Sequence, residues 1–272
     1  MRKKMPYSKD ELQKLYMEEG SIGKVASKLS KPYSTVRYWY EKNDIKVQPS
    51  CMTIYQELRE TPMSQFQKSI VLGSVLGDGN LKLAPHSKNA RLRIGHCKKQ
   101  IGYLKWKYDM LQPFSRKFGL DQPAKEKIYK GKKFKSTDFY RFHTVVHPDI
   151  TYYYRKYYNK GNKIVHRDVI DELDLISLAI WFGDDGSSYR DKRTDAVMCS
   201  FATNSFSYKE QVVLVKALRR FFGGTIKIDE QGNKGRSDLL LRMYKTVYVK
   251  DFLYNIKSIL PKCIHYKIAL RD

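Results

Sequence analysis

Two similar apolar segments lie about a hundred residues apart, and they constrain the fold of this chain more than any other feature. The first is IVLGSVLGDGNL and the second is LAIWFGDDGSSY. In both, apolar residues recur at helical spacing, and the glycine of an Asp-Gly pair marks the end of the pattern. The sequence therefore predicts two buried helices, one ending at Asp78 and the other at Asp185.

A carboxylate at the C-terminal end of a helix is unfavourable by about 0.3–1 kcal/mol, because that end carries partial negative charge. A compensating cation is therefore expected. Each segment has two small residues four positions apart, namely Gly73 with Gly77 and Ala179 with Gly183. This spacing favours close packing of the two helices, which would bring Asp78 and Asp185 together. Paired carboxylates are typical of a Mg²⁺ site. A single copy would be explained as well by a core helix with an Asp-Gly turn, but two copies favour the metal site.

The motifs VLGSVLGDG (71–79) and LAIWFGDDG (178–186) resemble the two motifs of single-chain LAGLIDADG homing endonucleases. The resemblance covers roughly residues 65–271 and implies an α+β fold of two pseudo-twofold-related halves, with saddle-shaped sheets over DNA. When the motifs are aligned on Asp-Gly, Gly73 faces Ile180 and Gly77 faces Asp184. The helix seam is therefore not expected to be strictly symmetric.

The pattern after each motif agrees with this fold, because both halves read helix-strand-strand-helix-strand-strand-helix. In the first half, strands are expected at 80–84, 90–96, 126–131 and 137–146, and helices at 103–118 and 149–158. In the second half, strands are expected at 187–191, 196–206, 225–230 and 238–245, and helices at 209–223 and 247–260.

The N-terminal residues 1–46 are predicted to form a separate helix-turn-helix module, joined by a linker (47–63) to halves at 64–160 and 161–272. Ser8 and Glu11 form a capping-box pattern, and the spacing of Ala26 and Val36 fits the close crossing of two helices. Ser30 stands where the turn usually has glycine. The recognition helix would be Ser34–Lys42, with four side chains facing the major groove: Ser34, Thr35, Arg37 and Tyr38. The alternative is a three-helix cap without DNA contacts.

Charge indicates the partner. The chain of 272 residues has 52 Lys and Arg against 28 Asp and Glu, a formal charge of +24, which favours a polyanion. No apolar run approaches ~20 residues, and the first residues lack the apolar segment of a signal peptide, so no membrane partner is expected. The expected location is intracellular, in a bacterial or phage-host cytoplasm or an organelle matrix. The four scattered cysteines are expected to be reduced, and the few histidines are more consistent with strand ends than with zinc.

Alternation along the strands predicts a cationic sheet face, with apolar residues on the other side. Arginine can read base edges, whereas lysine mostly meets phosphate. The predicted DNA-contacting residues of the sheets are Arg91, Arg93, Lys127, Arg141, Tyr189, Arg190, Lys227, Arg242 and Tyr244. For any single strand, a solvated face without a partner explains the pattern equally well.

Lys163 and Lys267 occupy equivalent places after the last helix of each half, and each is followed by Ile. Without the repeat they would be surface lysines. By resemblance to the family, they flank the metal site and organise water near the scissile phosphates.

The resulting hypothesis is a monomeric, site-specific double-strand DNA endonuclease that hydrolyses phosphodiesters. Asp78 and Asp185 would hold two or three divalent cations, Mg²⁺ being expected, and the carbonyls of Gly77 and Asp184 would complete the coordination. Unequal halves imply a long target that is only approximately palindromic. The resemblance further implies staggered cuts.

Three alternatives stay open. A splicing maturase would use the same fold to bind intron RNA, and a transcriptional regulator would bind DNA without cleavage. An intein is the least expected, because the chain starts with Met and ends in Leu-Arg-Asp rather than His-Asn.

Overall fold

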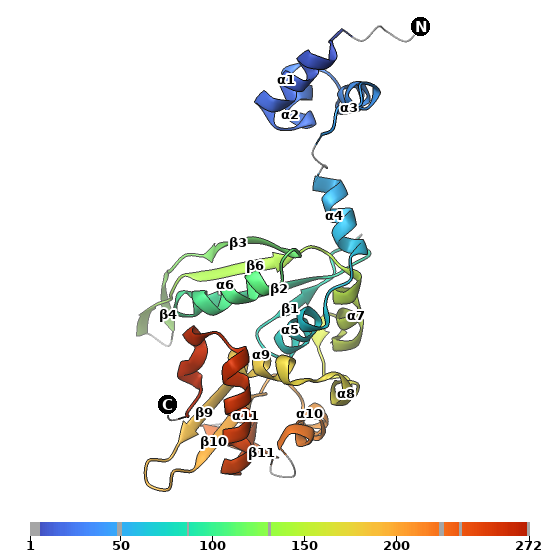
Figure 1. Cartoon of the computed structure of the whole chain (residues 1–272). Helices are drawn as coiled ribbons and strands as arrows, with labels where there is room; N and C mark the ends of the chain where they lie inside the picture. Colours follow the sequence, from blue (N-terminus) through green and yellow to red (C-terminus); the bar gives the residue numbers. More distant parts are fainter. Residues whose placement is uncertain are drawn as a thin grey trace. The chain divides into compact units, whose positions relative to one another are not determined.

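The computed structural model describes residues 6–47, 51–85, 87–129, 132–222, 226–233 and 236–270. The chain divides into two compact units, residues 1–57 and 58–272 (Figure 1). Helix α4 (Cys51–Glu60) runs across this division. The boundaries expected at residues 46, 63 and 160 stay predictions.

The N-terminal unit contains three short helices, α1 (Lys9–Glu19), α2 (Ile22–Lys28) and α3 (Tyr33–Lys42). The predicted capping box is present, because Ser8 accepts from the Glu11 amide and Glu11 accepts from the Ser8 amide. Ala26 and Val36 are buried in one apolar core, as their spacing predicted. Ser30 has φ 52°, so it adopts the left-handed conformation for which glycine is usually selected.

The larger unit contains two four-stranded antiparallel sheets of matching topology, β1-β2-β6-β3 and β9-β10-β12-β11. The first half consists of α5 (Gln65–Leu76), β1 (Asn80–Lys82), β2 (Arg91–Cys97), α6 (Ile101–Met110), β3 (Ser115–Gln122), β6 (Phe139–Thr144) and α7 (Pro148–Tyr157). The second half consists of α9 (Leu175–Asp185), β9 (Gly186–Arg190), β10 (Val197–Ala202), α10 (Tyr208–Phe222), β11 (Ile226–Asn233), β12 (Arg236–Met243) and α11 (Thr246–Ile259). The predicted αββαββα order is confirmed in both halves.

Shorter elements complete the unit. A hairpin of β4 (Glu126–Tyr129) and β5 (Lys132–Lys135) is inserted before β6, and β7 (Tyr158–Asn159) pairs with β8 (Asn162–Lys163). Helix α8 (Val169–Glu172) precedes α9, and the 3₁₀ helices η1 (Lys98–Gln100) and η2 (Lys262–Lys267) precede α6 and follow α11. No helix in the described part of the chain has both the length and the apolar character to cross a membrane.

Two secondary-structure predictions in the first half were wrong. The helix expected at 103–118 ends at Met110, and Ser115–Gln122 forms the strand β3. Pro113 explains the difference, since proline cannot continue a helix and disfavours helical backbone at the residue before it. The segment 126–131 was expected to be a main-sheet strand, but its described part belongs to the separate hairpin β4-β5. Residues 130 and 131 lie outside the described residues.

Helices α5 and α9 lie side by side and join the two halves (Figure 1). Gly73 and Gly77 allow this contact, because an added Cβ would lie 2.7 Å from the Ile180 Cβ at the first position and 2.5 Å from the Asp184 Cβ at the second. The pairs that face each other when the motifs are aligned on Asp-Gly, Gly73 with Ile180 and Gly77 with Asp184, are therefore in contact. The expected asymmetry of the helix seam is confirmed. The expected role of Gly183 was wrong, since it lies against Tyr103 of α6 rather than against α5.

Candidate active site

The two motif aspartates are presented by different backbone. Gly77 has φ −95° and ψ −135°, so the chain leaves α5 before Asp78, whereas Asp185 lies in the last turn of α9. Burial, then repulsion by Asp78 and Asp184, raises the pKa of Asp185 to about 7. Burial, then repulsion by Asp184, also raises the pKa of Asp78. The charge of Asp78 thus acts on Asp185, while among the described residues the ligand atoms that lie within 4.8 Å of one another come from Asp78, His96 and Asp184 and not from Asp185.

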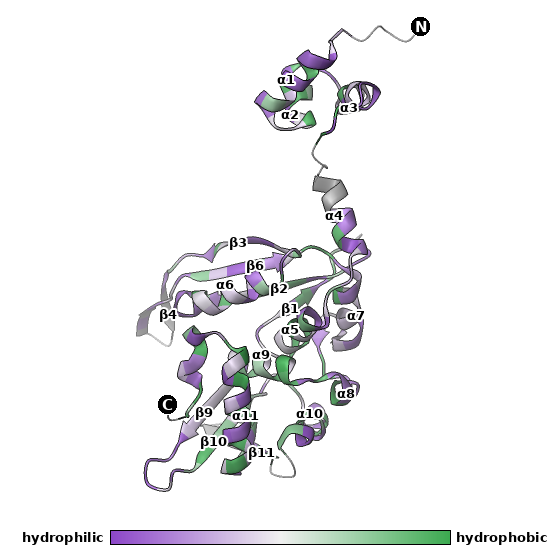
Figure 2. Ribbon diagram, in the orientation of Figure 1, coloured by the Kyte–Doolittle hydropathy of each residue, from purple (hydrophilic) through white to green (hydrophobic). Residues whose placement is uncertain are grey.

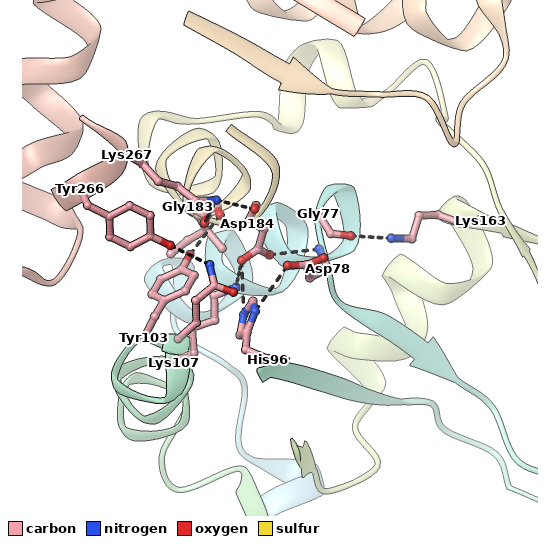
Figure 3. A network of polar contacts seen from close by, with 12 residues as sticks. Gly77, Asp78, His96, Tyr103, Lys107, Lys163, Gly183, Asp184, Tyr266 and Lys267 are labelled. Carbon is pink, nitrogen blue, oxygen red and sulfur yellow. Dashed lines mark hydrogen bonds and ion pairs between the residues drawn. The ribbon is translucent and has the colours of Figure 1, made fainter. Parts of the chain in front are cut away.

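Lys163 and Lys267 bind the carbonyl groups that end the two motif helices (Figure 3). The Lys163 ammonium donates to the Gly77 oxygen at 2.7 Å. The Lys267 ammonium donates to the oxygens of Gly183 and Asp184 at 2.8 and 2.7 Å. Burial lowers the pKa of both lysines. The two ammonium groups are the compensating cations expected at helix ends that also have carboxylates. The carbonyls of Gly77 and Asp184, predicted as metal ligands, are among the acceptors of these ammonium groups.

The Asp184 side chain, predicted only through its carbonyl, forms the centre of a buried cluster. Its carboxylate is paired with the Lys107 ammonium, and the side chains of both residues are 0% exposed. It also accepts from the Asp78 amide at 3.2 Å and lies 3.7 Å from His96 Nε2 (Figure 3). Tyr103 closes the cluster and donates to the Ile180 carbonyl at 3.1 Å. The alternating burial of β2 placed His96 inside, but no sequence signal marked Lys107 as buried.

Three side chains with metal-ligating atoms lie close together in this cluster. One ligand atom from each of Asp78, His96 and Asp184 lies within 4.8 Å of the others. Burial, then the charge of Lys107, lowers the pKa of His96 to about 3, so its imidazole is neutral at neutral pH. His96 Nε2 has no hydrogen-bond partner among the described residues. The three side chains have the spacing of a cation site, and His96 was not among the predicted site residues.

The first sheet has the predicted cationic face. In β2, Arg91 and Arg93 alternate with the buried Leu92 and Ile94. Arg91, Arg93, Lys117, Arg141 and His143 line one shallow hollow over β2, β3 and β6. Figure 2 shows β3 largely in the hydrophilic colour. The arginine pattern is therefore confirmed as a shared face, while its role in DNA contact stays a prediction.

The second sheet presents a similar face. Lys227 and Arg242 are direct cross-strand partners, and Tyr189 of β9 and Tyr244, directly after β12, are exposed. Arg242 forms an ion pair of 3.1 Å with Asp229, which also accepts from Tyr244. An acidic side chain thus lies among the predicted DNA contacts of this sheet.

The remaining predicted DNA-contacting residues do not lie on these two sheet faces. Arg190 lies on the sheet face opposite to Tyr189, and its Nε donates to Asp195 at 2.7 Å. Lys127 is in β4, and its side chain lies outside the described part of the structure. The four predicted residues of α3 belong to the other unit. Ser34, Arg37 and Tyr38 are exposed and Thr35 is half-buried, and Arg37 is paired with Glu41 at 2.7 Å.

Two halves of αββαββα order, joined along helices that end in carboxylates, are the architecture of a homing endonuclease. The structure of the homing endonuclease I-WcaI bound to its DNA recognition sequence superposes with a TM-score of 0.63 at 20% identity, covering 85% of this chain and 98% of that one. The family model for the LAGLIDADG DNA endonuclease family matches residues 68–252. The chain belongs to the LAGLIDADG DNA endonuclease family.

Curated relatives differ in length. Protein RecA of Mycobacterium gastri is 28% identical over 250 residues, 86% of this chain and 53% of the relative. DNA endonuclease I-ChuI of Chlamydomonas applanata is 26% identical over 214 residues, 76% of this chain and 96% of the relative. Cytochrome b mRNA maturase bI2 of Saccharomyces cerevisiae is 27% identical over 190 residues, 68% of this chain and 43% of the relative. The chain spans about half the length of the RecA proteins of Mycobacterium gastri and Mycolicibacterium flavescens.

Proposed function

We propose that this chain is a site-specific double-strand DNA endonuclease that depends on divalent cations, with Mg²⁺ as the physiological ion. The observation that carries the proposal is the pair Asp78 and Asp185, one from each half, at the common end of α5 and α9. The formal charge of +24 and the name of the I-ChuI relative support DNA as the substrate.

The residues at this end of the seam fit a divalent cation. The ionised forms of Asp78 and Asp185 are destabilised by burial and by nearby carboxylates, so a cation between them would be favourable. Asp78, Asp185 and the carbonyls of Gly77 and Asp184 supply the hard oxygens that Mg²⁺ prefers. When bound, such an ion supplies a Lewis acid and a water of lowered pKa.

The other residues bind and orient the DNA in this proposal. Lys163 and Lys267 donate hydrogen bonds to the carbonyl groups at the ends of the two motif helices. Each lysine places one positive charge at one active centre, where a phosphate is to be bound. Arg91, Arg93 and Arg141 of one half and Lys227 and Arg242 of the other contact phosphates and base edges. Because the two sheets present different side chains, the target is only approximately palindromic.

The N-terminal unit is proposed to add DNA contacts as a helix-turn-helix module. The supporting observation is the exposure of Ser34, Arg37 and Tyr38 on α3, while the apolar side of the helix fills the core. The chain is proposed to act as a monomer, because one chain supplies both carboxylates.

Asp78→Asn and Asp185→Asn test the proposal. Losing a charged metal ligand should reduce cleavage of a selected duplex by more than about 100-fold, since even outer-shell partners of a metal are worth about 10–100-fold. Binding in Ca²⁺ should stay close to that of the unmodified protein. Asp251→Asn, at an exposed position of α11, is the matched control and should cleave normally. Unchanged cleavage by both motif variants would refute the mechanism.

A maturase activity on intron RNA is the second candidate, and the likeness to the bI2 maturase favours it. Incubation with a randomised duplex library in Mg²⁺, beside binding assays with structured RNA, separates the two functions. The endonuclease proposal expects enrichment of cut duplexes. Binding to RNA without cleavage of any duplex would favour the maturase.

A further inference from the structure

The carboxylate of Asp184 has no counterpart in the other half of the molecule. Aligned on Asp-Gly, its position corresponds to Gly77, which has no side chain and packs directly against Asp184. The Asp184 side chain therefore reaches from the second half across the seam into the first. No equivalent group can reach back in the opposite direction.

In the described part of the chain, the hydrogen bonds and ion pairs of the Asp184 carboxylate are with the first half. Its carboxylate is paired with Lys107 of α6, and it accepts the backbone N–H of Asp78 at 3.2 Å. Both charged side chains are completely buried, and an ion pair this deep is weak evidence for a contribution to stability. The geometry instead indicates that the carboxylate holds the Asp78 backbone in position.

The two motif aspartates depend on different supports. Asp78 follows the last turn of α5, and its amide is held by a side chain from the other half. Asp185 lies within the last turn of α9, so its own helix holds it. The position of Asp78 therefore depends on a hydrogen bond across the seam to Asp184, whereas Asp185 is held by the helix that it shares with Asp184.

The strands that pair with β1 and β9, directly after the two motifs, also lead to different side chains at matching positions. Asn80 pairs with Arg93 and Ser187 pairs with Ser200, so His96 and Thr203 are at matching positions three residues further on. His96 lies between the carboxylates of Asp78 and Asp184. Thr203 instead hydrogen-bonds to Gln211 of α10 at 3.0 Å.

We propose that the buried Asp184–Lys107 pair positions Asp78 and makes the two active centres unequal, so that Asp184 and Lys107 are positioning residues for cleavage of one of the two DNA strands. The inference rests on the proposed endonuclease function and deepens it. It concerns the ratio of the two strand cleavage rates, which a purely structural role of the pair would leave unchanged.

Two double variants separate position from stability. Asp184→Leu with Lys107→Met replaces the ion pair by apolar side chains and removes the acceptor for the Asp78 amide. Asp184→Asn with Lys107→Met also removes both charges but keeps an oxygen acceptor. On a duplex end-labelled on each strand, the first variant should slow one strand about tenfold relative to the other, the size of one lost hydrogen bond to a charged group. The second should keep the ratio close to that of the unmodified protein.

Ser69→Ala is the control at the far end of the same seam, where the Ser69 hydroxyl donates to Asp174 at 2.5 Å. It should lower the unfolding temperature without changing the strand ratio. If the Leu/Met variant does not fold, Asp184→Ala with Lys107→Met carries the test, because it also removes the acceptor for the Asp78 amide, cannot overpack the seam and leaves no unpaired buried charge.

Equal slowing of both strands, or an unchanged ratio, in variants that fold and bind the duplex would overturn the inference. A failure of the endonuclease proposal itself is distinguishable, because the unmodified protein would then cut neither strand.

Discussion

The carboxylate of Asp185 lies among like charges, and this has a consequence for stability. Its pKa is about 7 in the folded protein, against 3.8 for an ordinary aspartate. Because the folded value is the higher one, its contribution to stability is fully present below about pH 4 and is lost as pH rises through about 7. One pKa unit corresponds to about 1.4 kcal/mol, so the loss is on the order of 4 kcal/mol.

Asp185→Asn should therefore flatten the pH dependence of the metal-free protein. Its free energy of unfolding should exceed that of the unmodified protein at pH 8 but not at pH 4, as measured by denaturant titration in a chelating buffer. A divalent cation should raise the stability of the unmodified protein at pH 8 and that of the variant less, since binding to the folded state is stabilising. A variant that retains the full pH dependence would show that another group is responsible.

At the scale of secondary-structure elements, the seam between α5 and α9 depends on Gly73. Gly73→Ala places a Cβ 2.7 Å from the Ile180 Cβ, so the helices must separate. We expect a loss of about 1–3 kcal/mol in the free energy of unfolding, typical of an overpacked core. Gly119→Ala in β3 is the matched control, since a Cβ there meets nothing within 4 Å. Equal effects of the two substitutions in denaturant titration would contradict close packing at the seam.

A second prediction concerns side chains on the strands and separates binding affinity from recognition of the base sequence. Lys227→Ala should weaken binding to all sequences alike and lower the slope of log affinity against log salt by about 0.9, the effect of one phosphate contact. Arg93→Ala or Arg242→Ala should cost about 1–3 kcal/mol mainly at one base position. Binding profiles over single-base target variants provide the measurement. For Arg242, uniform loss at every position would indicate that the arginine, paired with Asp229, contacts only phosphate.

At the scale of the whole molecule, the two units are separable in the proposed function. A chain beginning at Thr61 retains the hydrogen bonds of Thr61 and Met63 to the larger unit, through His147 and Asp149. It should fold and still cut, but with a shorter footprint and weaker binding, because a tethered module adds affinity by effective concentration. Nuclease protection and titration of both chains measure this. A footprint of unchanged length would assign the N-terminal helices a purely structural role.

The sequence by itself determined the repeated order of elements and the residues at the two helix ends. Helical and strand periodicities are local, and an Asp-Gly stop can be read without knowing its neighbours. For the same reason Arg91 and Arg93 were placed correctly opposite Leu92 and Ile94. The local signals failed at 103–118, where the apolar pattern continued past the break at Pro113.

Only the tertiary structure decided which way side chains point at the seam. Asp184 was a candidate through its backbone carbonyl, whereas its carboxylate lies in the other half against Lys107 and beside His96. Lys107 comes from a helix whose lysines look exposed in sequence, and it is buried because its charge meets that of Asp184. Such a contact joins residues 77 positions apart and depends on the close crossing of α5 and α9, which no periodicity within either segment encodes.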